Sequence, residues 1–361
     1  MTLPKPPSVP ASERLLARRR ETHKQITLSD ALARLASDSQ DETAALLRKA
    51  RELIQAGAIT LHADAEGDTA LMCAARNGQE ELVELLLPLS NPDAQTVTGD
   101  TALMMAARAP HENARVFQRL LECSDAKLAN QSGVTALMMA AKAGNAKFVE
   151  MALPRSDAKA RAGVNLSQAN ASGQTALILA AEAGSADCVA LLLPHSDLSA
   201  VRGYPGRNAL GAMLSMKAAG AKVRGADYPA TLNIMLPWFK DQIEKADGLG
   251  ESPLEIAAAH GHFECVKILA PLSPNVCAIK EWRDSPCFKA AAHQCWEIAD
   301  WLSDWVPESV AWHLQNIAGP EKMPKLAARI EKMVLVKEIR SVDAVGSDKN
   351  FPAKRIGGGR L

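Results

Sequence analysis

The chain has 361 residues, of which 47% are hydrophobic and only 4% are aromatic. Its 41 Lys and Arg balance 41 Asp and Glu, so the molecule has no net charge with which to attract a polyanion. The scarcity of aromatic residues disfavours a β-sandwich or barrel core, and we expect a mostly helical protein. The seven Cys are odd in number, and the sequence has no secretory leader pattern and no apolar run of about 18 residues. We therefore expect reduced thiols, a cytoplasmic location and no membrane span.

The amino-terminal residues divide into a basic arm and a helical cap. Residues 1–28 carry six Lys or Arg against two Asp or Glu, with four Pro among the first 12 residues, which predicts a flexible basic arm. This arm is either simply solvated or docks a partner. Residues 29–66 are predicted to form the cap, with one helix starting at Ser29 and a second running from Asp41 to Gln55.

Close copies of the phrase Gly-x-Thr-Ala-Leu-x-x-Ala-Ala follow the cap. The Gly suits a turn residue with positive φ, the Thr can cap the short helix that follows, and the Ala pair lets neighbouring helices approach closely. A longer apolar helix comes next, and a Pro ends it in most copies. Because so apolar a helix needs neighbours to bury it, the pattern predicts a stack of repeats with Met72, Met104 and Met138 between units. The copies begin at Gly67, Gly99, Gly133 and Gly173.

Together these residues resemble the ankyrin repeat, with Thr-Ala-Leu-Met where that family usually has Thr-Pro-Leu-His. Residues 252–269 match best, because they keep the Pro-Leu and the Gly-His of the family pattern. The resemblance implies an all-α solenoid of stacked helix-turn-helix units with short β-turn fingers. We predict ankyrin repeats over residues 67–306, a carboxy-terminal helical cap over 307–340 and a flexible tail over 341–361. The repeats are expected to start near residues 67, 99, 133, 173, 206, 250 and 283, with insertions at 158–168 and 218–229.

The motifs of common enzyme classes are missing from the sequence. We find no phosphate-binding Gly-x-x-x-x-Gly-Lys-Ser/Thr loop, no Gly-x-Ser-x-Gly elbow and no His-Glu-x-x-His helix. We therefore expect no enzymatic activity, no cofactor and no small-molecule substrate. The repeat register places Cys265 and Cys287 at core positions, so we expect small buried side chains and no metal site in the densest group of candidate ligands. That group is His260, His262, Cys265, Cys277, Cys287, His293 and Cys295.

Ankyrin arrays bind partner proteins through the finger tips and the exposed side of the first helices, on the concave side of the stack. The resemblance therefore implies a partner protein at the equivalent positions of this chain. Arg76, Arg108 and Lys142 would form a row of cations beside acidic tips, which suits a protein surface of mixed charge. The alternative is that these are unrelated solvated side chains. The finger positions are Glu66, Asp68, Asp100 and Gln174, and the helix positions are Arg76, Arg108, Lys142 and Glu182.

The fifth unit is irregular and is a second candidate for partner contact. Tyr and Arg are enriched at binding hot spots, and both types gather there. The alternative is a tolerated insertion. Five of the six Trp lie at positions 282–312, where they either complete the cap or form an interaction patch. The candidate residues of the fifth unit are Arg202, Tyr204, Arg207, Arg224 and Tyr228.

These observations predict a non-enzymatic protein–protein interaction scaffold that binds through its concave face, finger tips and insertions. One alternative is a bacterial or host-directed effector or regulator whose repeat array docks a target, and which would then act in the cytoplasm of a host cell. Another is that the basic termini contact nucleic acid, which the zero net charge disfavours.

Overall fold

The computed structural model describes residues 11–37, 43–109, 114–153, 166–200, 206–217, 226–273 and 285–347. Over these residues the regular structure is helical, apart from isolated bridges such as the antiparallel pairs Ala63 with Thr69 and Ala129 with Thr135. The prediction of an all-α protein of stacked helix pairs is therefore confirmed. The helices form two compact groups, the first within residues 1–249 and the second from residue 250 onward, with short stretches near 217–219 and 241–246 also in the second group.

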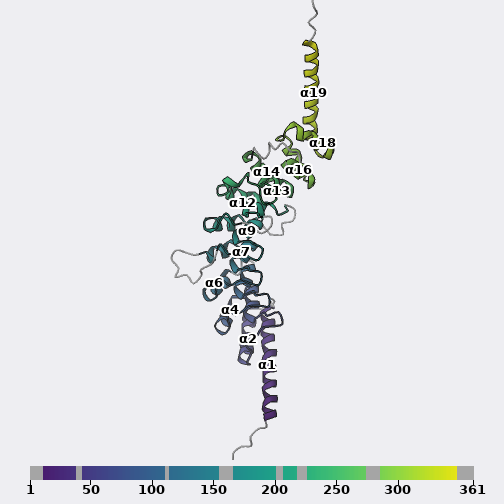
Figure 1. Ribbon diagram of the computed structural model, residues 1–361. Coiled ribbons are helices and arrows are strands. Elements are labelled where there is room, and N and C mark those ends of the chain that lie inside the picture. The colour runs from purple at the N-terminus through teal and green to yellow at the C-terminus, as the bar shows by residue number, and fades with distance from the viewer. Residues whose placement is uncertain are drawn as a thin grey trace, which may run out of the picture. The chain divides into compact units, whose positions relative to one another are not determined.

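The first group is a stack of helix pairs in chain order (Figure 1). Its first helices pack side by side in one row, and its second helices pack in a parallel row. The first-row helices are α1 (Ala11–Ser37), α3 (Ala70–Asn77), α5 (Ala102–Arg108), α7 (Ala136–Ala143), α9 (Ala176–Glu182) and α11 (Ala209–Leu214). The second-row helices are α2 (Thr43–Gln55), α4 (Glu80–Leu86), α6 (Ala114–Cys123), α8 (Ala146–Ala152), α10 (Ala186–Leu192) and α12 (Tyr228–Met235). Short 3-10 turns lie in this group at η1 (Leu87–Leu89) and η3 (Leu193–His195), and others follow along the chain at η5 (Lys240–Gln242) and, in the second group, η6 (Ala270–Leu272).

The predicted Thr caps are present in the four clear repeats. In each repeat the Thr hydroxyl accepts a hydrogen bond from the backbone N–H three residues later, which satisfies one of the donors left free at a helix start. The capping residues are Thr69, Thr101, Thr135 and Thr175.

The turns that precede these caps project as fingers, which we number 1 (residues 62–69), 2 (94–101), 3 (128–135) and 4 (168–175). Each finger bonds to the one before it. Val97 N donates to Glu66 O at 3.1 Å, Gln131 N to Thr98 O at 3.0 Å, and Ala171 N to Ser132 O at 2.9 Å. The fingers therefore form a ladder of backbone hydrogen bonds along the first group.

The interior of the first group is built from the residues that the repeated phrase predicted. The Ala pairs of the first helices are fully buried, and Met72, Met104 and Met138 are each 1% exposed between neighbouring units. In the second row the rings of Phe117 and Phe148 stack with their centroids 4.6 Å apart. Burial of these apolar surfaces stabilises each helix pair only in the presence of its neighbours.

The amino-terminal end differs from its prediction. One helix, α1, runs from Ala11 to Ser37, so the expected boundary after residue 28 falls inside it. Ser29 does not cap a helix. Its hydroxyl donates to Gln25 O within α1 at 2.7 Å and accepts from Ile59 N at 2.7 Å, which ties the helix to the chain beyond α2. Asp41 lies outside the described residues, and α2 ends at Gln55 as predicted.

The second group contains two short helix pairs followed by two longer helices. α13 packs against α16, and α17, α18 and α19 pack on one another at the end of the group. Asp300 on α17 accepts hydrogen bonds from Lys325 N and Leu326 N, which caps the start of α19. The helices are α13 (Pro253–His260), α14 (Phe263–Leu269), α16 (Pro286–Ala292), α17 (Trp296–Leu302), α18 (Glu308–Lys322) and α19 (Pro324–Ser347).

Helix α19 crosses the predicted start of the flexible tail at residue 341, because it continues to Ser347. The Trp residues of this group differ in their contacts and exposure. Trp301 meets Phe263 edge-on at 6.2 Å, whereas Trp305 and Trp312 are 40% and 36% exposed. Trp282 lies outside the described residues. Among the helices that are described, none is both long enough and apolar enough to cross a membrane.

Candidate protein-binding groove

Two adjoining hollows mark the finger side of the first group. One, of about 620 Å³, lies between α1 and finger 1 and is lined by Ile26, Asp30, Arg34 and His62 among others. The other, of about 430 Å³, lies between fingers 1 and 2 over α3 and α5. Ala65 and Glu66 line both hollows. We therefore treat them as one surface, the finger groove.

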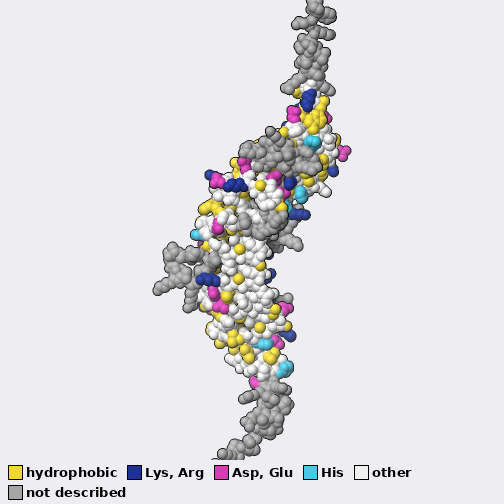
Figure 2. Space-filling model, viewed as in Figure 1, with side chains coloured by type: hydrophobic (Ala, Val, Ile, Leu, Met, Phe, Trp, Pro, Cys, Tyr) yellow, Lys and Arg dark blue, Asp and Glu magenta, His cyan; other side chains and the backbone are white. Residues whose placement is uncertain are grey.

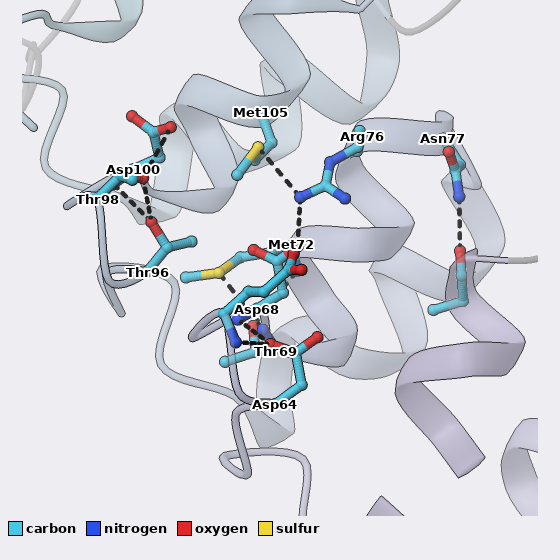
Figure 3. A network of polar contacts seen from close by, with 12 residues as sticks. Asp64, Asp68, Thr69, Met72, Arg76, Asn77, Thr96, Thr98, Asp100 and Met105 are labelled. Atoms are coloured by element: carbon cyan, nitrogen blue, oxygen red, sulfur yellow. Dashed lines mark hydrogen bonds and ion pairs between the residues drawn. The ribbon is translucent and has the colours of Figure 1, made fainter. Parts of the chain in front are cut away.

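A polar network sets the shape of this groove (Figure 3). The Asp64 carboxylate accepts from Glu66 N at 2.9 Å and from Asp68 N at 2.8 Å, which closes the turn of finger 1. Arg76, at the end of α3, forms an ion pair with Asp68 and points its guanidinium toward the Met105 sulfur at 3.6 Å. Asn77 donates to Ala36 O at 2.9 Å and so joins α3 to α1.

The finger positions predicted for partner contact divide by burial. Glu66 is exposed in the groove, but Asp68 and Asp100 are only 5% and 7% exposed. Asp68 is engaged by Arg76, and Asp100 accepts from Asn130 of finger 3 at 2.7 Å. These two carboxylates order the fingers, so the expectation that they face a partner is corrected.

The helix positions also differ from one repeat to the next. Glu182 is half-buried and accepts from the Gln174 amide at 2.7 Å, so these two predicted residues bond to each other. Arg108 and Lys142 are exposed at the ends of α5 and α7. Arg76, Arg108 and Lys142 therefore lie at or near the ends of three successive first-row helices, and Arg76 is paired with Asp68. That the three cations form a row facing a partner stays a prediction.

The comparison with known families decides the nature of this stack. The family model for ankyrin repeats matches residues 35–117 and 103–202. The chain is an ankyrin-repeat protein. The matched residues run from the end of α1 to beyond η3 and include fingers 1 to 4. A search of curated proteins returned no match to the chain.

Two of the contact residues predicted in the irregular fifth unit of the ankyrin stack, Tyr228 and Arg207, are largely buried. Tyr228 begins α12, is 7% exposed and donates its hydroxyl to Glu182 O at 3.3 Å. Arg207 forms an ion pair with Asp247 at 2.7 Å, with both side chains largely buried. Both residues hold the fold together, which corrects the expectation for them. Arg202, Tyr204 and Arg224 lie outside the described residues, as does most of each predicted insertion.

Sequence reasoning missed the contribution of α1 to the ankyrin groove. Ile26, Asp30 and Arg34 line it, and the Asp30 carboxylate lies 3.0 Å from the His62 ring nitrogen of finger 1. It also missed Val97, which is 64% exposed at the tip of finger 2. An alignment of the fingers would have found Val97, because Ala65, Gln131 and Ala171 hold the equivalent position.

Two cysteines of this ankyrin protein, Cys265 and Cys287, are buried as the register predicts. Cys188 is also buried, and burial raises the pKa of the Cys188 thiol to about 11, so that this thiol stays protonated at neutral pH. Cys287 donates its S–H to Ala299 O at 3.0 Å. In the described part of the chain, no three His, Cys, Asp or Glu gather closely enough to hold a metal ion, and Cys277 lies outside that part.

Proposed function

We propose that this protein is a non-enzymatic interaction scaffold whose finger groove binds a segment of a partner protein. Ankyrin repeats are in general protein–protein interaction modules, and no enzyme family is found in the chain. The observation that carries the proposal is the meeting of the two hollows at Glu66, which makes one surface across α1, α3, α5 and two fingers.

The chemistry of the groove suits a protein segment. Val97 offers an exposed apolar side chain, while Glu66 and Arg34 offer charges of opposite sign within the same surface. An apolar anchor surrounded by polar groups is the usual composition of a protein interface. A partner of ordinary interface size buries about 800 Å² on each side, so it would extend beyond the two hollows along further fingers.

The distribution of charge supports a protein partner over a polyanion. Among the described residues on the face drawn in Figure 2, basic and acidic side chains are intermixed, and the basic ones do not gather in a single field. The groove itself contains Asp30, Asp64 and Glu66, which would repel a phosphate backbone.

Affinity capture with the full chain, followed by mass spectrometry, tests this proposal. Glu66→Lys reverses a charge inside the groove, and Glu81→Lys makes the same change at an exposed position of α4, outside the groove. Proteins that wild type and Glu81→Lys retain, and that Glu66→Lys and Val97→Asp lose, are the expected result. A set of captured proteins that is the same for all four chains would overturn the proposal.

A further inference from the structure

A pairing between finger and helix recurs in the first group at a separation of eight residues. In the first repeat, Asp68 of finger 1 forms an ion pair with Arg76, the seventh residue of α3. In the fourth repeat, Gln174 of finger 4 bonds to Glu182, the seventh residue of α9, at 2.7 Å. In these two repeats the charge at the end of the first helix is met by its own finger.

The pairing fails in the second and third repeats, for a different reason in each. In the second repeat Asp100 bonds to its own finger and the next one: one carboxylate oxygen accepts from Asn130 at 2.7 Å and the other from the Thr98 hydroxyl at 3.4 Å. In the third repeat the finger position is Val134, which has no acceptor to offer Lys142. Within the part of the chain that the structure describes, neither Arg108 nor Lys142 forms an ion pair or a side-chain hydrogen bond. Two exposed cations on neighbouring helices are therefore left without a counter-charge.

We infer that Arg108 and Lys142 form a binding site for an acidic segment of a partner protein. The carboxylates of that segment would accept hydrogen bonds from the two cations, which fingers 2 and 3 do not do. This inference rests on the proposed function, and it specifies the chemistry of the partner next to the finger groove. The two cations occupy equivalent seventh positions of α5 and α7, which pack side by side.

The spacing of the two helices sets the spacing of the carboxylates. Packed helix axes are about 8–10 Å apart. An extended polyproline II segment repeats its side-chain direction every third residue, with a rise of about 3.1 Å per residue, so acidic residues three apart lie about 9 Å apart on one side. An acidic residue at every third position of such a segment therefore matches Arg108 and Lys142.

A nucleic acid fits this site less well than an acidic protein segment. Its phosphates continue at close intervals in both directions, and toward the amino terminus they would meet Glu66 and Asp64 of the groove. A short acidic segment can place two carboxylates on the cations and end before it reaches those acids. The charge pattern of the stack thus selects for a ligand of limited negative charge.

Binding of a fluorescein-labelled peptide of four Glu-Pro-Pro units to the full chain tests the inference. Fluorescence polarisation at low ionic strength is suitable, because the Debye length is about 30 Å at 0.01 M salt. We expect wild type and Lys142→Arg to bind the peptide. Arg108→Gln and Lys142→Gln should each lower the affinity for the peptide by up to about fivefold, the size of effect found for exposed charge pairs. A peptide of four Gln-Pro-Pro units is expected to bind more weakly than its Glu counterpart by the product of those two effects.

A second set of variants leaves both cations in place. Val134→Glu supplies the missing finger carboxylate for Lys142, so it is expected to lower the affinity for the Glu peptide as much as Lys142→Gln does. Val134→Gln is expected to leave the affinity within about twofold of wild type. Gln118→Glu adds the same charge at an exposed position of α6 and serves as the matched control. Asp68→Asn releases Arg76 from its partner and is expected to tighten binding by up to about fivefold.

Three outcomes would overturn the inference: equal affinity of wild type and the Arg108 and Lys142 variants, equal affinity of the Glu and Gln peptides, or tighter binding of a single-stranded DNA oligonucleotide of the same charge through the same two residues. Circular dichroism of each variant confirms that the fold is retained. Because the peptide assay uses no captured partner, its failure leaves the capture result with Glu66→Lys intact. A negative capture result with positive peptide binding would reject the finger groove and keep the site formed by Arg108 and Lys142.

Discussion

Replacement of Gly67 by Ala tests the contact between fingers that orders the groove. Gly67 has a φ of +83°, and a Cβ built there would lie 2.6 Å from Val97 N and 2.9 Å from Thr96 Cα. Ordinary contacts begin near 3.4 Å, so finger 2 has to move by about 0.8 Å to make room. The Val97 N to Glu66 O hydrogen bond, 3.1 Å long, lies at the same place and would be stretched by that movement.

The expected cost is the sum of a backbone effect and a packing effect. A non-Gly residue in the left-handed region costs about 1–2 kcal/mol, of which about 0.4–1 kcal/mol is recovered because Ala restricts the unfolded chain. Loss of the interfinger hydrogen bond adds about 1 kcal/mol, and the forced movement of backbone adds about 1 kcal/mol more. Gly67→Ala is therefore expected to destabilise the protein by about 3 kcal/mol.

Gly57→Ala is the matched control, because Gly57 also has a positive φ, +100°, but a Cβ at this position would have no described atom within 4 Å. It should cost only the backbone effect, about 1 kcal/mol or less. Urea denaturation followed by circular dichroism measures both free energies, and hydrogen exchange of the Val97 amide reports the finger contact directly. Equal destabilisation by the two substitutions, with unchanged exchange at Val97, would refute the reasoning.

Two further substitutions test the interior contacts of each group. Asn145 is 3% exposed and donates hydrogen bonds to Ala107 O and Ala109 O at 3.1 and 2.9 Å. Asn145→Ala removes the donor for both buried carbonyls and should lower the free energy of unfolding, measured by urea denaturation, by about 2–3 kcal/mol. A loss under about 0.5 kcal/mol would mean that water replaces the amide. Burial raises the pKa of Glu255 above 4.5, and the hydrogen bonds to Ser252 partly offset that rise. The protonated carboxyl therefore contributes most to the stability of the folded state below pH 4.5. This contribution to stability declines as the pH rises through the pKa of Glu255 in the folded state. Glu255→Gln keeps a hydrogen-bond acceptor for the capping box, so its free energy of unfolding should rise relative to that of wild type between pH 4.5 and 7. A difference in free energy of unfolding between the two chains that stays constant with pH would contradict the raised pKa.

The local features of the repeats were predictable from the sequence because each depends on residues close together in the chain. A positive φ at Gly99 and the cap at Thr101 involve residues within a single turn and the first turn of α5. The burial of Met104 follows from its place between two Ala-rich helices. These patterns repeat with every unit, so one unit predicts the next.

The candidate site was only partly predictable, since its geometry depends on residues about 30 positions apart or more. Ser29 reads as a helix cap in isolation, yet its hydroxyl bonds to Ile59 N, 30 residues away. Tyr228 reads as a hot-spot residue, yet its ring lies inside the stack against Gly184. In both cases the side-chain hydroxyl forms a hydrogen bond with a backbone group far away in the sequence, which the local sequence does not reveal.

The sequence by itself determined that this chain is a helical array of ankyrin repeats, because turns, caps and apolar faces are set within each unit and recur in register. Only the tertiary structure decided which charges of the array remain available. Asp68 and Asp100 hold equivalent positions in the sequence, but one neutralises the Arg of its own repeat and the other bonds to Asn130 of the next finger. That choice depends on the packing of neighbouring fingers, and it leaves Arg108 exposed without a counter-charge from the described residues. For Lys142 the equivalent finger position is Val134, so there the sequence already withholds the carboxylate.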